Sequence, residues 1–181
     1  MKATGIVRRI DDLGRVVIPK EIRRTLRIRE GEPLEIFTDH EGEIILKKYS
    51  PIGELALFAQ QYAESLAQTS GHVVCVADRD QIIAAAGGGK GMIGKSISQQ
   101  LEDVIESRDV VMAKKDEKKF VPVAEDYAEE AVGQVIAPII SEGDAIGAVI
   151  IYSKDDGVKM SEVEQKLVLS AAGFLGRQME Q

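Results

Sequence analysis

The sequence contains no tryptophan, one cysteine and only two histidines among its 181 residues. The single cysteine, Cys75, excludes an internal disulfide, and it stands in the apolar segment 72–77, where a small buried residue is the expected role. His40 and His72 have no cysteine or histidine companions at metal-ligand spacing, which argues against a zinc site. We therefore expect a reduced compartment, an aliphatic core and no metal or other cofactor.

Long hydrophobic runs are also missing. Apolar stretches such as residues 145–152 are far shorter than the ~20 residues that span a bilayer, and residues 1–6 do not resemble a signal sequence. The remaining composition, 44% hydrophobic and 29% charged, is typical of a folded globular protein. We expect a cytoplasmic protein of one medium or two small domains, without a membrane partner.

Charge of one sign is concentrated at the amino terminus. Residues 1–29 hold nine lysines and arginines against three acids, a net charge of +6, and residues 1–50 have a net charge of +2. The other 131 residues have a net charge of −9. A local basic cluster in an acidic chain indicates a nucleic-acid site on one part of the protein.

The first fifty residues predict a ββαββ unit. Its elements are strands 4–10 and 15–18 joined through Gly14, a helix over about 19–26, and strands 34–38 and 43–47. A unit of fifty residues without a disulfide or metal removes little surface from water when it folds, so its stability as a single copy is expected to be marginal. We expect two copies to share one sheet or barrel core.

Four basic residues of the predicted helix recur at one helical spacing. Lys20, Arg23, Arg24 and Arg27 stand at i, i+3, i+4 and i+7, and therefore share one face. A solvated helix face is the commoner role for such a run. However, Glu21 is the only acid on this helix, so the positive charges are not neutralised by neighbours and favour an anionic partner.

Three segments of this unit, 4–8, 12–19 and 23–26, closely resemble the AbrB family of bacterial transition-state regulators, and the resemblance covers residues 1–50. It implies a swapped-hairpin β-barrel dimer whose arginines bind double-stranded DNA. Arg9 is a weaker match because a lysine is usual there, and Lys20 is included only for its place in the helical stripe. The candidate DNA-binding residues are Arg8, Arg9, Arg15, Lys20, Arg23, Arg24 and Arg27.

A domain boundary is expected near Pro51, which cannot continue a strand. We predict a linker at 51–55 and a second domain at 56–181. Its expected elements are helix 54–70, strands 72–77 and 81–86, helix 96–107, hairpins 110–113/120–123 and 132–141/145–153, and helix 161–179 with a Ser161–Glu164 capping box.

This order resembles a GAF domain, a module that senses small molecules, and the whole chain is predicted to be of the α+β class. The resemblance implies a small-molecule effector, which the sequence does not identify. The amphipathic helices at the two ends of this domain are expected to pair between subunits as a four-helix bundle and so to form a tetramer.

A rival function comes from residues 89–96, which fit the P-loop pattern G-x-x-x-x-G-K-[ST] with Gly89, Gly94, Lys95 and Ser96. A P-loop enzyme needs a parallel sheet, whereas these strands are predicted as hairpins. A second rival is an antitoxin-like interaction protein, although such chains usually continue into a disordered tail.

We therefore expect a regulator without enzymatic activity. The resemblance implies both activation and repression of sporulation genes in the forespore, with ligand sensing and tetramerisation assigned to the second domain.

Overall fold

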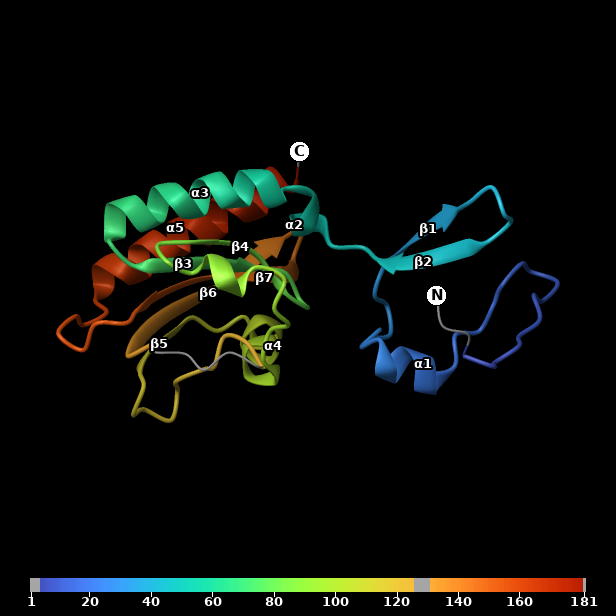
Figure 1. The fold of residues 1–181 in the computed structure, drawn as a ribbon, viewed down its shortest axis with the longest axis horizontal. Coiled ribbons are helices and arrows are strands. Elements are labelled where there is room, and N and C mark those ends of the chain that lie inside the picture. Colours follow the sequence, from blue (N-terminus) through green and yellow to red (C-terminus); the bar gives the residue numbers. More distant parts are fainter. Residues whose placement is uncertain (1–3, 126–130, 181) are drawn as a thin grey trace. The chain divides into compact units, whose positions relative to one another are not determined.

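The computed structural model describes residues 4–125 and 131–180, and the chain separates into two compact units (Figure 1). The N-terminal unit ends at Tyr49 and the C-terminal unit begins at Ser50. The N-terminal unit contains helix α1 (Lys20–Thr25) and strands β1 (Leu34–Thr38) and β2 (Ile44–Lys48).

Strands β1 and β2 form an antiparallel hairpin in which Ile36 lies opposite Leu46. Its turn is held by Asp39, whose Oδ1 accepts the N–H groups of Glu41 and Glu43 at 3.0 and 2.8 Å. The helix and both strands were expected from the sequence, and all three are present.

The first predicted hairpin differs. Residues 4–18 contain no strand, although a turn at residues 11–14 is closed where the Gly14 N–H donates to the Asp11 carbonyl at 3.0 Å. A strand is stabilised by ladder bonds to a neighbour, and within one chain residues 4–18 have only the turn bonds and a local bond from the Ile6 N–H to the Thr4 hydroxyl. The predicted turn at Gly14 is therefore confirmed. The predicted strands 4–10 and 15–18 are not formed in a single chain.

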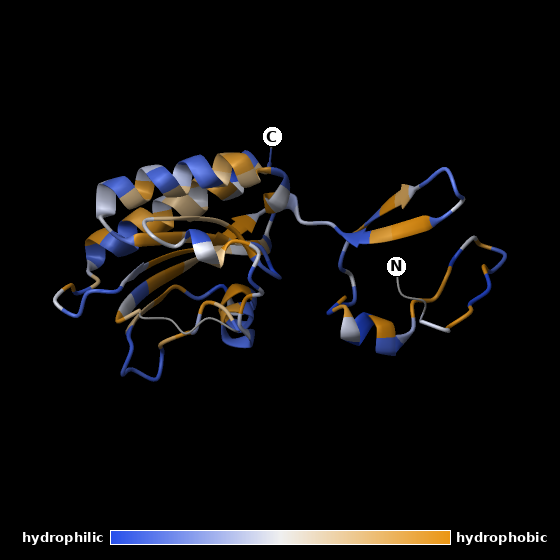
Figure 2. Cartoon of the chain, viewed as in Figure 1, coloured by the Kyte–Doolittle hydropathy of each residue, from blue (hydrophilic) through white to orange (hydrophobic). Residues whose placement is uncertain are grey.

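No residue of the described segment 4–49 is buried, although the segment is rich in large apolar side chains. Figure 2 shows them as hydrophobic stretches along β2 and the segment before α1. Those that are exposed are Ile6, Val7, Ile10, Leu13, Val16, Val17, Leu26, Ile36, Phe37, Ile44, Leu46 and Tyr49. One copy of this unit therefore leaves the apolar residues of a potential core in contact with water.

The C-terminal unit is a five-stranded antiparallel sheet between helices, in the strand order β4-β3-β7-β6-β5. Its elements are α2 (Pro51–Glu54), α3 (Ala56–Ser70), β3 (Val73–Ala77), β4 (Ile82–Ala86), the 3-10 turn η1 (Lys90–Met92), α4 (Gln99–Ser107), β5 (Val111–Lys114), β6 (Gly133–Ser141), β7 (Asp144–Ser153) and α5 (Glu162–Gln178). With both sheets antiparallel, the α+β class is confirmed.

Each face of this sheet packs into a separate core. Helices α3 and α5 cover one face and α4 lies on the other (Figure 1). Alternation along β6 assigns Val135 and Ala137 to the α3/α5 core and Ile136 to the α4 core. Cys75 is fully buried in the α4 core, as expected from its apolar segment.

The predicted linker 51–55 is a different structure. Residues 51–54 form α2, which begins at the N-cap Ser50, and Ile52 is fully buried in the α3/α5 core. Proline is favoured in the first turn of a helix, and Pro51, three residues after the end of β2, is the first residue of α2.

The predicted strand 120–123 is also absent. Strand β5 pairs with β6 instead, with Met112 opposite Val135. Pro122 has no N–H to give to a ladder, and its carbonyl accepts the Ser98 hydroxyl. The Ser98 hydroxyl also accepts the Leu101 N–H at 3.0 Å, so α4 begins three residues later than the predicted helix.

Helix α5 has the predicted capping box. The Ser161 Oγ accepts the Val163 N–H at 3.2 Å, and the Glu164 carboxylate accepts the Ser161 N–H at 2.7 Å. Partial burial raises the pKa of Glu164. Hydrogen bonds from Ser161, together with the nearby His72, outweigh that effect and hold the pKa below its usual value.

Across the described parts of the chain, no helix has the length and apolar character needed to cross a membrane.

Candidate nucleic-acid interface

The basic residues of the N-terminal unit lie on a turn, a short helix and the residues just after it. In the turn, the Asp11 Oδ1 accepts the N–H groups of Leu13 and Arg15 at 3.0 and 2.8 Å, while Gly14 adopts a φ of +76°. The Asp11 Oδ2 accepts the Arg15 Nε–H at 2.8 Å. This contact orients the Arg15 guanidinium and leaves its two terminal nitrogens for another acceptor.

The pKa of Asp11 is lowered, first by the hydrogen bond from the Arg15 N–H and then by the bond from its guanidinium. Asp11 therefore stays ionised and keeps Arg15 in place. Sequence reasoning missed this residue as part of the site. The sequence feature that could have revealed Asp11 is the Asp–x–x–Gly turn, in which the aspartate side chain commonly accepts hydrogen bonds from nearby backbone N–H groups.

Helix α1 contains the charged residues Lys20, Glu21, Arg23 and Arg24. Lys20 and Arg24 are exposed and Arg23 is half-buried. Arg23 and Arg24 lie in the last turn, where cations interact favourably with the helix carbonyls, and Glu21 lies in the first turn. The short helix thus gathers three of the seven candidates.

Arg27 is not on this helix, contrary to the predicted stripe. It follows the C-cap Leu26 with a φ of +52°, and the N–H groups of Arg27 and Ile28 donate to the carbonyls of Arg24 and Arg23. This pair of bonds is a Schellman motif, which ends the helix before the stripe is complete. The Arg27 carbonyl accepts Lys48 Nζ at 2.7 Å, which attaches the helix end to β2.

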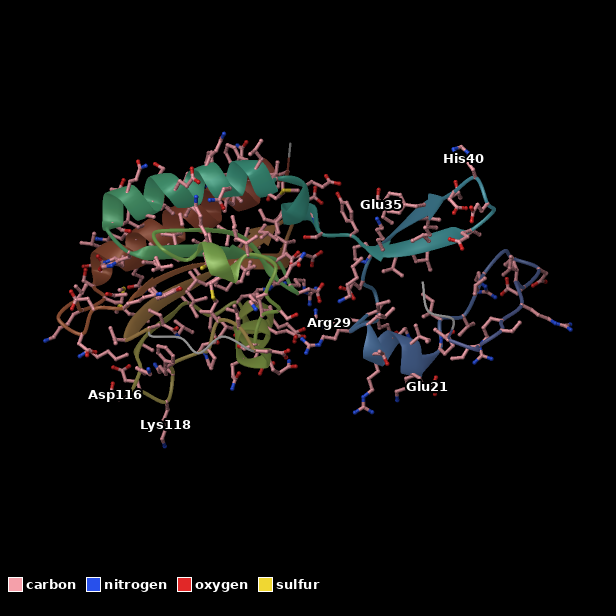
Figure 3. The ribbon with its side chains drawn as sticks, in the orientation of Figure 1. Glu21, Arg29, Glu35, His40, Asp116 and Lys118 are labelled. Carbon is pink, nitrogen blue, oxygen red and sulfur yellow. The ribbon has the colours of Figure 1, made fainter. Side chains whose placement is uncertain are left out.

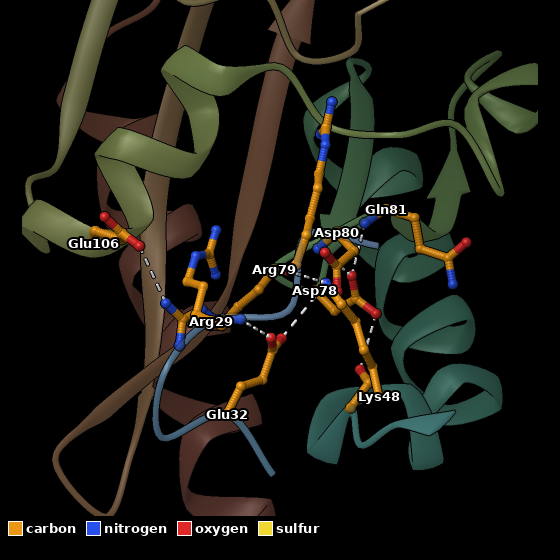
Figure 4. Close-up of polar contacts among 10 residues, drawn as sticks. Arg29, Glu32, Lys48, Asp78, Arg79, Asp80, Gln81 and Glu106 are labelled. Atoms are coloured by element: carbon orange, nitrogen blue, oxygen red, sulfur yellow. Dashed lines mark hydrogen bonds and ion pairs between the residues drawn. The ribbon is translucent and has the colours of Figure 1, made fainter. Parts of the chain in front are cut away.

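Arg8 and Arg9 lie in the segment before the turn, which has no regular secondary structure, and both are exposed. If these residues pair as a strand in the dimer, their side chains point to opposite faces, because consecutive strand residues alternate. Lys48 also lies 3.6 Å from the Glu32 Oε1, and the other oxygen of Glu32 accepts the Arg29 N–H at 2.8 Å (Figure 4). These contacts join the loop after α1 to β2.

The P-loop candidate at residues 89–96 does not have phosphate-binding geometry. The N–H groups of Met92, Ile93, Gly94 and Lys95 all donate to carbonyls of the chain itself, at 2.8–3.3 Å. Residues 90–92 form the 3-10 turn η1, and Ser96 forms a bridge with Gln81 instead of starting a helix. A P-loop requires free N–H groups at a helix start, so the motif is a local coincidence.

A buried polar side chain in the C-terminal unit was not singled out from the sequence. Gln134 is fully buried on β6, on the α4 face of the sheet, and lies opposite Tyr152 of β7. Neither its Oε1 nor its Nε2 has a hydrogen-bond partner among the described residues. A buried polar group without a hydrogen-bond partner usually lowers the stability of the fold by about 1–3 kcal/mol, so the presence of Gln134 in an apolar core requires an explanation.

Several lysines lie at the end of β5 and in the turn that follows it. Asp116 and Lys118 project outward from this turn (Figure 3), and residues 114–119 are exposed. A surface pocket of about 360 Å³ lies beside it, and its lining includes three lysines, two aspartates, Gly133 and Met160.

Two family models match the chain, and their matches meet at residue 54, close to the boundary between the two units. Residues 54–180 match the family model described as stage V sporulation protein T C-terminal, transcription factor. Residues 7–54 match the family model of MazE, a bacterial antitoxin that recognises its toxin.

Two relatives from Bacillus subtilis (strain 168) are similar in sequence. Stage V sporulation protein T is 57% identical over the full length of both chains. The transition state regulatory protein AbrB is 67% identical over 51 residues, which cover 28% of this chain and 52% of AbrB.

Among solved structures, two that match the C-terminal unit share its fold. A fragment of a methyl-accepting chemotaxis protein, residues 122 to 287, matches with a TM-score of 0.57 at 18% identity, covering 70% of this chain and 93% of the fragment. The GAF domain of PixJ from Thermosynechococcus elongatus matches with a TM-score of 0.56 at 12% identity, covering 74% and 89%. The GAF-like fold expected from the sequence is confirmed.

Proposed function

The chain belongs to the family of stage V sporulation protein T transcription factors, and on this premise we propose that it binds double-stranded DNA through the arginines of its N-terminal unit. The observation that carries the proposal is the group of exposed and half-buried arginines on α1 and on the turn before it, in a segment with a net charge of +6. As a regulator of sporulation genes it would act in the forespore cytoplasm, where its DNA target lies, and would both activate and repress.

Guanidinium groups suit this role because they pair with phosphates in a bidentate manner and can also reach base edges in the major groove. Arg15 is already oriented by Asp11, so less conformational freedom is lost when it meets a phosphate. Arg8, Arg9, Lys20, Arg23, Arg24 and Arg27 complete the proposed DNA-binding surface.

The N-terminal unit would work as a dimer with interleaved hairpins. In this arrangement residues 4–10 and 15–18 gain the strand partners that a single chain does not offer. The exposed apolar side chains of the unit then form a shared core. Each Å² of apolar surface removed from water stabilises the dimer by about 25 cal/mol.

A direct test measures the affinity of the full chain for a labelled duplex by fluorescence anisotropy. Arg23→Ala/Arg24→Ala should weaken binding about tenfold or more, because each arginine makes charge-assisted hydrogen bonds. Lys118→Ala/Lys119→Ala removes the same charge from an exposed turn of the other unit and should change the affinity little. Equal losses in the two variants would contradict the proposal.

The C-terminal unit would sense a small molecule and join dimers into a tetramer. Support for an effector comes from the unsatisfied amide of Gln134 in the α4 core, because an amide both donates to and accepts from a polar ligand. Support for the tetramer comes from Leu57 on α3 and Val163 and Leu169 on α5, which are exposed apolar residues. A dimeric mass of the full chain at all concentrations in analytical ultracentrifugation would contradict the proposed tetramer.

A second candidate, a toxin-binding antitoxin, has one observation in its favour, the match of residues 7–54 to the MazE model. The full-length similarity to a sporulation protein and the folded C-terminal unit favour the regulator. The two functions differ in that only the regulator requires Arg23 and Arg24 for its main interaction.

A further inference from the structure

Asp78, at the end of β3, is a buried carboxylate with both oxygens in use. Asp78 is only 5% exposed. The Oδ1 accepts the N–H groups of Asp80 and Gln81, each at 2.7 Å, and the Oδ2 accepts the Ser50 hydroxyl at 2.9 Å (Figure 4). The carboxylate therefore fixes the β3–β4 turn and one residue that lies 28 positions earlier.

Ser50 is the residue at which the chain enters the C-terminal unit. While its hydroxyl donates to Asp78, the same oxygen accepts the Gly53 N–H at 3.1 Å and so caps α2. Ile52, in the first turn of α2, is fully buried in the α3/α5 core. The first turn after the N-terminal unit is thus held from two sides, by the core and by Asp78.

The β3–β4 turn is also attached to the opposite side of the sheet. The Arg79 Nη2 lies 3.3 Å from the Glu106 Oε1 on α4, and the Asp80 carbonyl accepts the Ile97 N–H at 2.9 Å. Helix α4 covers the core that contains Gln134. The β3–β4 turn therefore contacts both Ser50, the first residue of the C-terminal unit, and helix α4, which lies over the proposed effector site.

We propose that Asp78 is a positioning residue for DNA binding, which fixes through Ser50 the point where the DNA-binding unit joins the rest of the chain. This inference rests on the proposed function. A fixed junction limits the positions available to a second DNA-binding unit once the first is bound, which raises its effective concentration on the same DNA. The junction therefore matters for a long duplex that engages two units and not for a short duplex that engages one.

The test replaces Ser50 in the full chain and compares two duplexes, one of about two helical turns and one of about six, by fluorescence anisotropy. Ser50→Asp keeps an acceptor for the Gly53 N–H, but it cannot donate to Asp78 and places two carboxylates together. Ser50→Thr keeps both bonds. Ser161→Asp, at the α5 cap, makes the same exchange beside Glu164 and away from the junction.

Ser50→Asp should weaken binding to the long duplex about threefold to tenfold, as expected for the loss of one hydrogen bond, and leave the short duplex unchanged. Ser50→Thr and Ser161→Asp should bind both duplexes as the unmodified chain does. Equal losses on both duplexes, no loss on either, or the same loss in Ser161→Asp would overturn the inference.

Hydrogen exchange in the unmodified chain gives a second measurement that does not depend on a variant folding. Binding of the long duplex should slow exchange at the amides of Gly53, Asp80 and Gln81 together, and unchanged exchange would overturn the inference. The proposed function fails separately, if the unmodified chain binds neither duplex or if Arg23→Ala/Arg24→Ala binds the short duplex normally.

Discussion

Gly176 of α5 lies directly against the backbone carbonyl of Ile140 in β6, so closely that a Cβ on Gly176 would overlap the Ile140 oxygen. The helix reaches this distance from the sheet only because the residue has no side chain. The contact closes the α3/α5 core at the end of the chain, where Leu175 is fully buried.

The first prediction follows from this contact. Gly176→Ala should lower the free energy of unfolding by about 1–3 kcal/mol, because the helix must move away from the sheet. Gly173→Ala, one turn earlier with nothing near its Cβ position, should raise it by about 0.5–1 kcal/mol through helix propensity. Urea denaturation of the two variants checks this, and equal effects would contradict the close approach.

A second prediction concerns Arg27, which ends α1 in the left-handed region. Arg27→Gly should stabilise the N-terminal unit by about 0.5–1 kcal/mol, because glycine adopts this conformation without strain. Arg24→Gly, inside the helix, should destabilise it by about 1 kcal/mol. Thermal unfolding distinguishes the two. A loss of stability in Arg27→Gly would show that the Schellman geometry is not populated.

The dimer gives a third prediction. Ile36 is 67% exposed in one chain, and there a substitution by lysine would change the stability by no more than about 0.5 kcal/mol. In the shared core of a dimer, Ile36→Lys would bury a charge and should dissociate or unfold the N-terminal unit. Glu35→Lys, on the other face of β1, is the control. Sedimentation equilibrium with an unchanged mass for Ile36→Lys would contradict the interleaved dimer.

A fourth prediction follows from the lowered pKa of Glu164. A carboxylate whose pKa is lower in the folded state stabilises that state above its usual pKa of 4.5, and the effect is lost as the pH falls through the lowered value. Glu164→Gln should therefore lower the free energy of unfolding at pH 7 by about 0.5–1 kcal/mol. When the pH falls below 4.5, the free energy of unfolding should decrease less in this variant than in the unmodified chain. Parallel stability curves between pH 7 and pH 3 would contradict this.

Elements that depend on local signals could be predicted from the sequence. Helix α5 was marked by Ser161 and Glu164, whose reciprocal bonds span only three residues. The β6–β7 hairpin was marked by two apolar runs around a short polar turn. Such elements carry their own start and end signals, so their bounds were predicted to within two residues.

Features that depend on distant partners could not be predicted. Ser50 and Asp78 meet across 28 positions, and neither residue marks the other in the sequence. Pro122 prevents a strand that the apolar pattern around it favours. The seven basic candidates were visible as a cluster, but the αL conformation of Arg27 and the bond from Arg15 to Asp11 depend on backbone geometry.

The central claim is that arginines of the N-terminal unit bind DNA phosphates, and the salt dependence of binding tests it most directly. The slope of log K against log salt concentration becomes shallower by about 0.9 for each phosphate that the protein no longer neutralises. We predict that Arg23→Ala/Arg24→Ala lowers the slope of the full chain by about 2, and that Lys118→Ala/Lys119→Ala leaves it unchanged. A slope in Arg23→Ala/Arg24→Ala equal to that of the unmodified chain would contradict the account.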